Sequence, residues 1–279
     1  MINVIWYDGQ RGRWDHGLLL SIFDKHPDIF IQYNEVLPPK ETKRSIVVVA
    51  GCPSPERLYG YLSTLPDSVV ILVSDEDAYF DWKSAIPSQH TIITQYWNPE
   101  LKGDIKERIL LGAPARLKDY KINTHLPKKY LWSFIGQVQN EFRQKCVDVL
   151  RTLPDGFLHI APQFGGGEGG IGYQEYLDIC CQSHFVMCPS GSMTAETFRA
   201  YEAMECGAIP ICDQRSPRDV AAFNYWREVY PYNKLHSLSN WEQLPELLKL
   251  EWEPPSYVNK WWFDYKKELE QKLLRYATN

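Results

Sequence analysis

Short apolar runs alternate with amphipathic segments over residues 1–125, which is the pattern of a parallel α/β sheet. The runs are mostly β-branched and predict strands at residues 2–7, 29–33, 46–50, 69–74 and 91–94. Helical spacing predicts helices at residues 15–25 and 55–65, with Asp15 and Ser54 as capping residues. We therefore expect residues 1–125 to form one domain around a doubly wound parallel sheet.

The alternation pauses at residues 112–128, where we expect a linker, and restarts at residue 130. Further strands are predicted at residues 130–135, 157–160, 185–188 and 208–212, and helices at residues 140–153, 173–182 and 194–206. We expect residues 126–255 to form a second domain of the same type. Two such halves suggest an α/β fold in which two Rossmann-like domains face a cleft.

Beyond residue 213 the pattern predicts helices at residues 217–227, 241–250 and 257–276. The third is long and amphipathic, and it follows the helix-breaking pair Pro254-Pro255. We treat residues 256–279 as a terminal helix with two possible placements. It crosses back onto the N-terminal domain, or it packs wholly on the C-terminal domain.

Residues 184–213 combine a strand, a polar loop, a helix and a second strand, which is the βαβ unit of a parallel sheet. Such sheets bind ligands in the loops at the carboxyl ends of their strands. Within the predicted helix, Arg199 and Glu202 are three residues apart and share one face. They form either a solvated salt bridge or a ligand site, in which Arg199 binds a phosphate and Glu202 accepts hydrogen bonds from a ribose or sugar diol.

Three segments in this half resemble motifs of exostosin-like glycosyltransferases. Residues 197–211 (TFRAYEAMECGAIPI) are similar to the family's S-x-R-x-x-E-A-x-x-x-G-x-I-P-V signature, and residues 185–191 (FVMCPSG) to its F-x-x-C-P-x-G segment. Residues 132–136 (WSFIG), followed by Arg143, resemble its F-x-G…R segment. The resemblance covers about residues 109–213, and the motifs occur in the family's order.

The resemblance implies a GT-B fold, a nucleotide-diphosphate-sugar donor and inversion at the anomeric carbon. It implies a hexosyl- or pentosyltransferase whose hydroxyl acceptor is a glycan, a small molecule or a hydroxylated base. Many members carry a basic residue where this chain has Ser190, so the nucleotide and the sugar stay open. The alternative from another functional class is a nucleotide- or sugar-binding α/β protein without transferase activity.

An inverting transfer needs positive or dipolar groups to stabilise the leaving diphosphate. We expect a site without metal or other cofactor, in which arginines, hydroxyls and helix N-terminal amides take this role. For Arg143 the alternative is an exposed helix residue with no part in binding. The donor-binding candidates are Gly136, Arg143, Ser190, Gly191, Ser192, Thr194, Arg199 and Glu202.

The transfer also needs a base for the acceptor hydroxyl, and the loop after the first predicted strand offers candidates. In the alternative, Asp15 is only a helix N-cap and His16 is a surface residue. The candidates for the base are Asp8, Asp15 and His16, with Arg11 and Arg13 on the acceptor side.

Residues 75–77 (DED) follow another predicted strand, and Asp75 and Glu76 are further candidates for contacts with the acceptor. The same segment matches D-x-D, the manganese-binding signature of GT-A glycosyltransferases, with Asp75 and Asp77 as ligands. A metal-dependent enzyme of that type is the alternative to a metal-independent site. We interpret the glycine-rich residues 165–172 as a mobile loop that closes over the donor, rather than as a phosphate cradle.

Composition narrows the class of partner. The chain has 279 residues and a net charge of −5, which argues against a protein that mainly clamps nucleic acid; nucleic acid is possible as an acceptor but not favoured. Seven cysteines without a C-x-x-C pair indicate buried free thiols rather than disulfides or a zinc site. No signal pattern and no run of about 20 apolar residues is present, so we expect a cytoplasmic protein without a membrane span.

Overall fold

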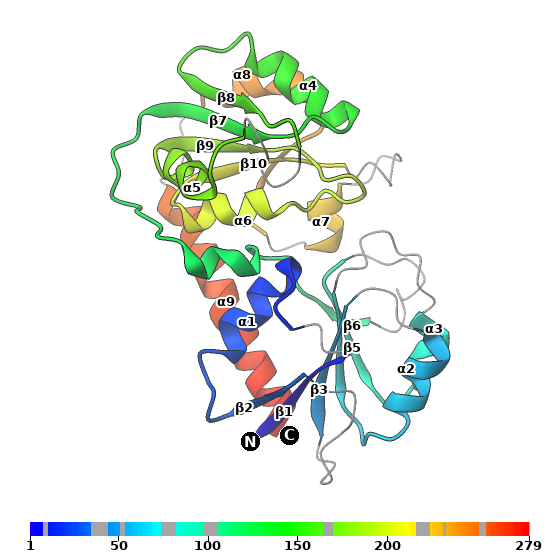
Figure 1. The fold of residues 1–279 in the computed structure, drawn as a ribbon. Coiled ribbons are helices and arrows are strands. Elements are labelled where there is room, and N and C mark those ends of the chain that lie inside the picture. Colours follow the sequence, from blue (N-terminus) through cyan, green and yellow to red (C-terminus); the bar gives the residue numbers. More distant parts are fainter. Residues whose placement is uncertain are drawn as a thin grey trace. The chain divides into compact units, whose positions relative to one another are not determined.

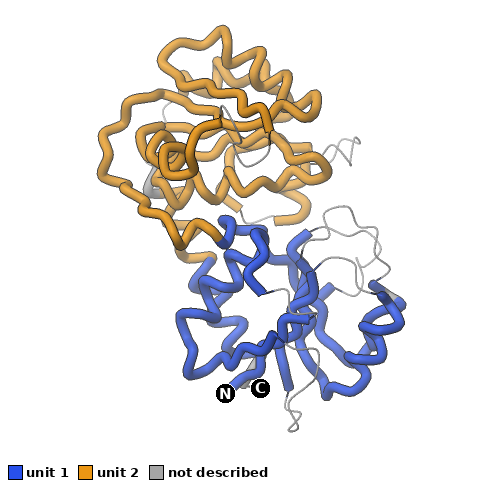
Figure 2. The backbone as a smooth tube through the Cα atoms, in the orientation of Figure 1, with its two compact units in different colours: residues 1–115, 266–279 blue, residues 116–265 orange. Residues whose placement is uncertain are grey.

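The computed structural model describes residues 1–7, 11–34, 44–50, 54–73, 82–96, 105–163, 170–215, 224–230, 233–250 and 255–278. The chain divides into two compact units (Figure 2). Unit 1 comprises residues 1–115 and 266–279, and unit 2 comprises residues 116–265. The units therefore divide after residue 115, whereas the sequence pattern placed the boundary after residue 125.

Unit 1 is built on a six-stranded sheet with the order β2-β1-β3-β4-β5-β6, in which every neighbouring pair is parallel. The strands are β1 (Ile2–Trp6), β2 (Phe30–Tyr33), β3 (Ser45–Ala50), β4 (Val69–Val73), β5 (Thr91–Thr94) and β6 (Ile105–Arg108). The helices are η2 (Trp14–His16, a 3₁₀ turn), α1 (Gly17–Phe23), α2 (Pro55–Leu62), α3 (Trp82–Ala85) and part of α9 (Pro255–Thr278). Helices α1 and α9 lie on one side of this sheet, and α2 and α3 lie on the other (Figure 1).

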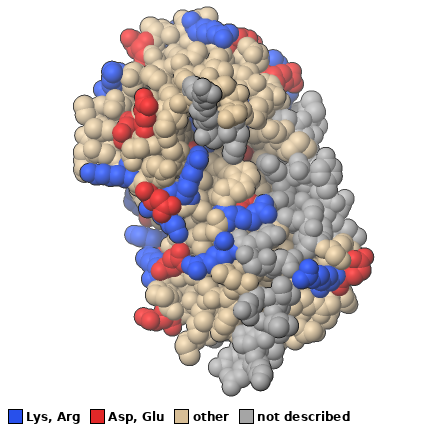
Figure 3. Space-filling model, viewed as in Figure 1, with Lys and Arg blue, Asp and Glu red and all other residues tan. Residues whose placement is uncertain are grey.

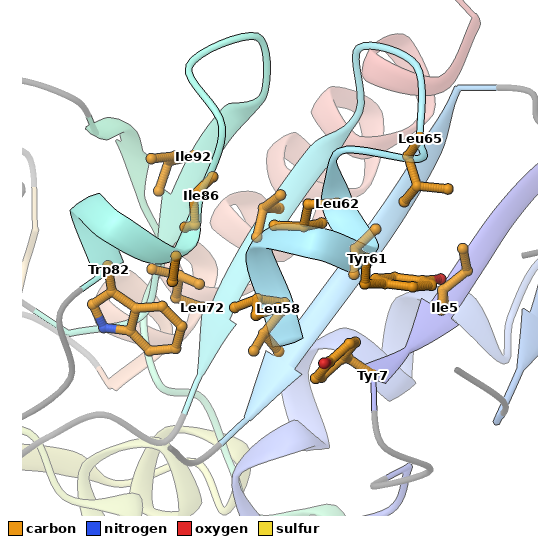
Figure 4. Packing of buried hydrophobic residues seen from close by; sticks show 14 residues of the cluster. Ile5, Tyr7, Leu58, Tyr61, Leu62, Leu65, Leu72, Trp82, Ile86 and Ile92 are labelled. Atoms are coloured by element: carbon orange, nitrogen blue, oxygen red, sulfur yellow. The ribbon is translucent and has the colours of Figure 1, made fainter. Parts of the chain in front are cut away.

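The centre of unit 1 is apolar on both faces of the sheet. Every residue of β3 and β4 is buried, as expected for branched side chains in strands that are covered on both sides. On the side of α2 and α3, Leu58, Leu62 and Trp82 pack with Leu72 of β4 in one cluster (Figure 4). This packing fixes the positions of the strand ends from which the loops of unit 1 start.

Unit 2 contains a five-stranded sheet with the order β11-β10-β9-β7-β8, again parallel throughout. The strands are β7 (Tyr130–Gly136), β8 (Gly156–Ile160), β9 (Ser183–Cys188), β10 (Ile209–Asp213) and β11 (His236–Leu238). The helices are η4 (Ala115–Asp119), which begins at the unit boundary, α4 (Glu141–Leu150), α5 (Tyr173–Cys181), α6 (Phe198–Glu205), α7 (Tyr225–Val229), η5 (Trp241–Gln243) and α8 (Leu244–Leu247). Helices α4 and α8 lie on one side of the sheet, and α5 and α6 on the other (Figure 1).

The predicted fold class, α/β with two Rossmann-like parallel sheets, is confirmed by these two units. The predicted cap of α2 is also confirmed, because the Ser54 hydroxyl accepts the Arg57 N–H at 3.3 Å. The sequence pattern missed β6 and β11, which are both edge strands. Strand β6 has the sequence IKER and β11 has only three residues, so neither presents an apolar run. That the two domains face a cleft stays a prediction.

Each sheet has one point at which the chain reverses the direction in which it adds strands. In unit 1 the chain goes from β1 to β2 on one side and then to β3 on the other, so the reversal lies between β1 and β3. In unit 2 it lies between β7 and β9 for the same reason. Crevices for ligands form at the carboxyl ends of the strands at such points. These two places are therefore where functional residues are expected.

Helix α9 contributes to both units, because residues up to Tyr265 belong to unit 2 and those from Lys266 belong to unit 1. In unit 2, the Trp262 indole Nε1 donates to Glu205 at 2.7 Å. In unit 1, Glu270 pairs with Lys25 at 2.7 Å and with His26 at 2.5 Å. Helix α9 therefore forms polar contacts within each unit.

The other compositional expectations concern cysteines, charge and hydropathy. The six cysteines within the described residues are free and buried, as predicted, and Cys52 lies outside those residues. Acidic and basic side chains both occur across the described part of the face in Figure 3. Among the described helices, none combines the length and the apolar character that crossing a bilayer requires.

Two glycines provide a matched pair for testing the packing. A Cβ at Gly156 would collide with the buried indole of Trp132, whereas a Cβ at Gly60 on α2 would meet no heavy atom within 4 Å. We expect Gly156→Ala to lower the free energy of unfolding by about 1–3 kcal/mol through overpacking. Gly60→Ala should raise it by about 0.5–1 kcal/mol, because alanine has less backbone entropy to lose in a helix. Calorimetric melting of both variants checks this, and equal melting temperatures would contradict it.

Candidate functional site

Two arginines lie at the carboxyl-terminal edge of the unit 2 sheet. Arg143 is on α4, which follows β7, and Arg199 is on α6, which follows β9, so they come from the two sides of the strand-order reversal. Arg143 is half-buried, and it donates from Nε to the Ser190 carbonyl at 2.9 Å and from Nη1 to the Gln137 carbonyl at 3.2 Å. The alternative in which Arg143 is an exposed helix residue is therefore wrong.

Arg199 lies against the end of β7. Its Nε donates to the Ile135 carbonyl at 3.1 Å, and its guanidinium carbon is 5.0 Å from the centroid of the Phe134 ring. A Cβ at Gly136 would collide with Nη2 of Arg199, so glycine is what permits this approach. Nη1 of Arg199 is buried and has no hydrogen-bond partner among the described residues. A buried N–H group of a cation is thus left to bond with an anionic ligand.

The two guanidinium groups are close enough to affect each other. Burial and the charge of Arg199 together lower the pKa of Arg143 to about 10, and the charge of Asp213 acts in the opposite direction. With this pKa, Arg143 stays charged at neutral pH. A half-buried pair of like charges is costly by itself and becomes favourable when an anion lies between them. The arrangement is suited to a phosphate or diphosphate.

Hydrogen bonds to Asp213, the last residue of β10, fix the loop that follows β9. Asp213 Oδ2 accepts the Ser190 N–H at 2.6 Å and the Ser190 hydroxyl at 2.8 Å. Burial raises the pKa of Asp213 to about 6, while the hydrogen bonds from Ser190 and the charge of Arg143 oppose this rise. Asn140, the N-cap of α4, adds a bond from Nδ2 to the Gly191 carbonyl at 2.8 Å. Ser190 is therefore buried in the wall of the site.

The other predicted hydroxyls of this loop are placed differently from one another. Ser192 is exposed, with its hydroxyl 3.3 Å from Gln139 Oε1. Thr194 is buried, and its hydroxyl accepts the Glu196 N–H at 3.3 Å. Among these side chains Ser192 is the one that solvent reaches most easily, and the Gly191 N–H is used in a turn with the Thr194 carbonyl at 2.8 Å.

The prediction that the helix begins at Thr194 is wrong, because α6 begins at Phe198. The preceding residues are held in a non-helical conformation by the carboxylate of Glu196. This carboxylate is buried and accepts the Tyr201 hydroxyl at 2.6 Å and the Tyr225 hydroxyl at 2.8 Å. The loop hydroxyls are consequently one turn away from the amides that begin α6.

Glu202 is buried on α6 and bonded to two tyrosines of α5. The Tyr173 hydroxyl donates to Oε1 at 2.5 Å, and the Tyr176 hydroxyl donates to Oε2 at 2.7 Å. Burial raises the pKa of both phenols, and the charge of Glu202 raises it further, so they stay protonated as donors. Within the described residues Arg199 forms no ion pair with Glu202. The salt-bridge alternative for these two residues is therefore wrong.

In unit 1, Asp15 and His16 follow β1, next to the other strand-order reversal. Both side chains are completely buried, with exposed fractions of 1% and 0%, and neither caps α1, whose start has no side-chain cap. The alternative of an N-cap and a surface histidine is therefore wrong. The carboxylate oxygens and both imidazole nitrogens lack hydrogen-bond partners among the described residues. Trp6 packs on the imidazole with ring centroids 4.8 Å apart.

Burial shifts the pKa values of this pair in opposite directions. It raises the pKa of Asp15, against the charge of Arg13, whose Nε lies 3.7 Å from Asp15 Oδ1. Burial, with the charge of Arg13 acting in the same direction, lowers the pKa of His16 to about 4, so the imidazole is neutral at pH 7. The contact between Asp15 and His16 at 3.6 Å is consequently not an ion pair. Buried carboxyl groups with raised pKa values are typical of proton-transfer sites.

Several predicted residues lie elsewhere or outside the described ranges. Arg11 is exposed and pairs with Asp24 at 2.7 Å. Asp8 and the segment 75–77, with Asp75, Glu76 and Asp77, lie outside the described residues, as does most of the glycine-rich segment at 165–172. In the described part of the chain, no three His, Cys, Asp or Glu side chains are grouped so that they could hold a metal ion.

Sequence reasoning missed the carboxylates and phenols that support the arginines. Asp213 ends an apolar strand, which is a position from which a side chain enters the ligand crevice, and this signal was available. Tyr173 and Tyr176 are three residues apart at the start of α5, so they share a face. Their partner could not be predicted, because the contact joins residues from two helices.

The comparisons with known proteins concern most of the chain. Residues 115–278 match the family model described as the RXYLT1 C-terminal domain. The chain is also similar to a solved structure described as the crystal structure of an α1,3-fucosyltransferase, with a TM-score of 0.48 and 10% identity, over 96% of this chain and 81% of that chain. No curated protein matches the chain.

The buried Asp213 makes stability depend on pH. Its pKa is about 6 in the folded protein against an ordinary value of 3.8, so the folded state binds the proton more tightly. Stability contributed by the protonated carboxyl is complete below about pH 4 and is lost as the pH rises through about 6. Asp213→Asn cannot ionise, so its melting temperature should rise relative to the unaltered protein between pH 4 and pH 6.5. The exposed Asp148→Asn is the control, and a gap that does not change with pH would contradict the assignment.

Proposed function

The chain belongs to the RXYLT1 C-terminal domain family, and we propose that it moves a sugar from a nucleotide-diphosphate donor to a hydroxyl acceptor. The family match supports glycosyltransferase activity in general, and the donor and acceptor are our assignment. The observation that carries it is the half-buried arginine pair at the strand-order reversal of unit 2, with a buried N–H of Arg199 unbonded among the described residues.

In this proposal unit 2 binds the donor. Arg143 and Arg199 bind the diphosphate, because guanidinium groups form paired, charge-assisted hydrogen bonds with phosphate oxygens. They offset the charge that develops on the leaving diphosphate, so we expect no requirement for a metal ion. Glu202 accepts a hydrogen bond from the ribose of the nucleotide. It lies one helical turn from Arg199 on α6, so one helix face serves both the phosphate and the ribose.

The proposed reaction is a single displacement that inverts the anomeric carbon. The acceptor oxygen forms a bond to that carbon as the bond from the carbon to the diphosphate breaks. The diphosphate leaves with the bonding electron pair, and the acceptor hydroxyl loses its proton to a base. Such a base accelerates the step most when its pKa is near the working pH.

We assign the role of base to Asp15 in unit 1. Its raised pKa makes it a stronger base than an ordinary carboxylate, while the lowered pKa of His16 makes the imidazole a weaker one. The carboxylate oxygens have no hydrogen bonds among the described residues that would compete for the proton. His16 is neutral at pH 7 and lies beside the carboxylate at 3.6 Å, so it limits the number of orientations that Asp15 can adopt.

The assignment of the diphosphate to the arginine pair predicts a selective loss of affinity. Arg199→Ala should weaken the binding of uridine and guanosine diphosphates by about 10- to 150-fold, since a hydrogen bond to a charged group contributes about 1.5–3 kcal/mol. The corresponding nucleosides should lose much less, because they carry no phosphate.

Isothermal titration calorimetry measures both losses, and Arg151→Ala is the control, because Arg151 is exposed on the same unit. Equal losses for the diphosphate and the nucleoside would show that Arg199 is only structural. Binding without any transfer or hydrolysis of a donor sugar would instead indicate a non-catalytic binding protein.

The assignment of the base predicts a pH profile. A carboxylate base is active only after it loses its proton, so turnover should rise with pH through the raised pKa of Asp15 and then level off. Asp15→Asn should lower kcat by about 10²- to 10⁴-fold and abolish this rise. The initial rate of transfer is measured between pH 4 and pH 8. A rise that persists in Asp15→Asn would assign the titration to another group.

A further inference from the structure

The two hydrogen bonds on the Glu202 carboxylate come from tyrosines in unequal surroundings. Tyr176 is buried, and its hydroxyl donates to Oε2 at 2.7 Å from the interior side of α5. Tyr173 is the first residue of α5, is half-buried, and donates to Oε1 at 2.5 Å. A molecule that approaches Glu202 from solvent therefore meets Tyr173 before it meets the carboxylate.

The outer side of the Tyr173 ring is covered by exposed side chains. The guanidinium carbon of Arg116 lies 3.9 Å from the ring centroid, and Tyr120 meets the ring edge-on with centroids 4.7 Å apart. Both covering residues are exposed, and cation–π contacts at exposed sites contribute little. The inner neighbour, Tyr176, is stacked at 5.7 Å and is itself fixed in the core. The ring of Tyr173 thus meets a residue fixed in the core on its inner side, and on its outer side it meets exposed side chains, of which Arg116 also bonds to the phenol.

Glu202 is only 4% exposed, so a ribose hydroxyl cannot bond to it while both phenols and their rings stay in place. One partner has to give way, and the cost is lower for the half-buried phenol than for the buried one. A phenol hydroxyl and a ribose hydroxyl can each donate one O–H to a carboxylate oxygen. The exchange therefore replaces one hydrogen bond with another and leaves the carboxylate satisfied.

We propose that Tyr173 is a displaceable partner of Glu202, whose hydroxyl occupies on Oε1 the position that a ribose hydroxyl takes when a nucleotide binds. This rests on the proposed function, in which Glu202 binds the ribose. Tyr176 is the permanent partner and orients the carboxylate. Tyr173 sets specificity, because a ligand that offers no hydroxyl at this position cannot compensate for the bond that it breaks. The pair thereby selects ribonucleotides over their deoxy counterparts.

The test compares two conservative variants that remove one hydroxyl each. Tyr173→Phe leaves Oε1 without its competing donor, so it should tighten the binding of uridine and guanosine diphosphates by about two- to tenfold. Tyr176→Phe leaves Oε2 unsatisfied and the carboxylate less well oriented, so it should weaken binding by a similar factor. Tyr130→Phe is the control, because Tyr130 is the first residue of β7, at the opposite end of that strand from the site, and its loss of a hydroxyl should leave affinity unchanged.

A second measurement separates selectivity from general damage to the site. The same diphosphates are titrated together with their 2′-deoxy and 3′-deoxy counterparts, and the ratio of the dissociation constants is compared between variants. Tyr173→Phe should increase the preference for the ribonucleotide, because Oε1 of Glu202 then lacks its phenol partner and gains a hydrogen bond from a ligand that carries the hydroxyl. A purely structural role would change both constants by the same factor and leave the ratio fixed, and this result overturns the proposal.

The remaining outcomes are also distinguishable. If Tyr173→Phe and Tyr176→Phe weaken binding equally, Tyr173 is a permanent partner and the inference is wrong. If the unaltered protein binds ribo- and deoxynucleotides equally, Glu202 does not receive the ribose, although the arginine pair can still bind the diphosphate. If it binds none of these diphosphates, the proposed function fails and the inference fails with it. Melting temperatures near that of the unaltered protein show that each variant is folded.

Discussion

Repulsion between two half-buried cations is the constraint on which the carboxyl-terminal edge of the unit 2 sheet depends. Arg143 and Arg199 are kept near each other by bonds to backbone carbonyls at the ends of β7 and β9. Carbonyl oxygens carry only partial charge, so they orient the guanidinium groups without neutralising them. Asp213 supplies a full negative charge, but it is shared with Ser190. The guanidinium groups therefore keep their charge in surroundings that water reaches poorly, where their attraction for a diphosphate is stronger than in bulk water.

The same edge contains carboxylates that are buried, and each is satisfied in a similar way. Glu196 and Glu202 both accept hydrogen bonds from two tyrosine hydroxyls. Phenols are donors that remain neutral at physiological pH, so they stabilise a buried carboxylate without adding a second buried charge. The bonds to Glu196 shape the segment before α6. Those to Glu202 orient its carboxylate, a hydrogen-bond acceptor, beside Arg199. The tyrosines thus influence both the backbone conformation before α6 and the orientation of the Glu202 carboxylate.

Much of the fold was predictable from the sequence, because buried parallel strands have continuous apolar sequences. Strands β3 and β4 are fully buried and were predicted to within one residue at each end. Strand β6 was missed because an edge strand need not be apolar, and in its IKER sequence three charged residues follow one isoleucine. The start of α6 was misplaced since the bonds of Glu196 involve Tyr225, which is distant in sequence. Local propensity contains no information about such a contact.

For the candidate site, too, the sequence identified some residues, while the folded structure was needed to show what they do. Arg199 and Glu202 were identifiable by spacing and motif, whereas burial decided what they do, and burial is a property of the packed chain. Asp15 and His16 show this most clearly, because their sequence suits a cap and a surface residue, yet the structure buries both. Sequence therefore located the loops that bear chemistry, and only packing showed which of their side chains are removed from water.

The path of the chain through unit 1 has a consequence for biosynthesis. Unit 1 consists of residues 1–115 together with residues 266–279, so it is discontinuous, whereas unit 2 is one continuous segment. The carboxylate that pairs with Lys25 and His26 belongs to Glu270 and is translated after all of unit 2. During translation the N-terminal sheet must wait for its covering helix, while the later unit already has all its residues up to Tyr265. Chaperones that bind exposed apolar surface would accordingly have access to residues 1–115 for longer than to unit 2.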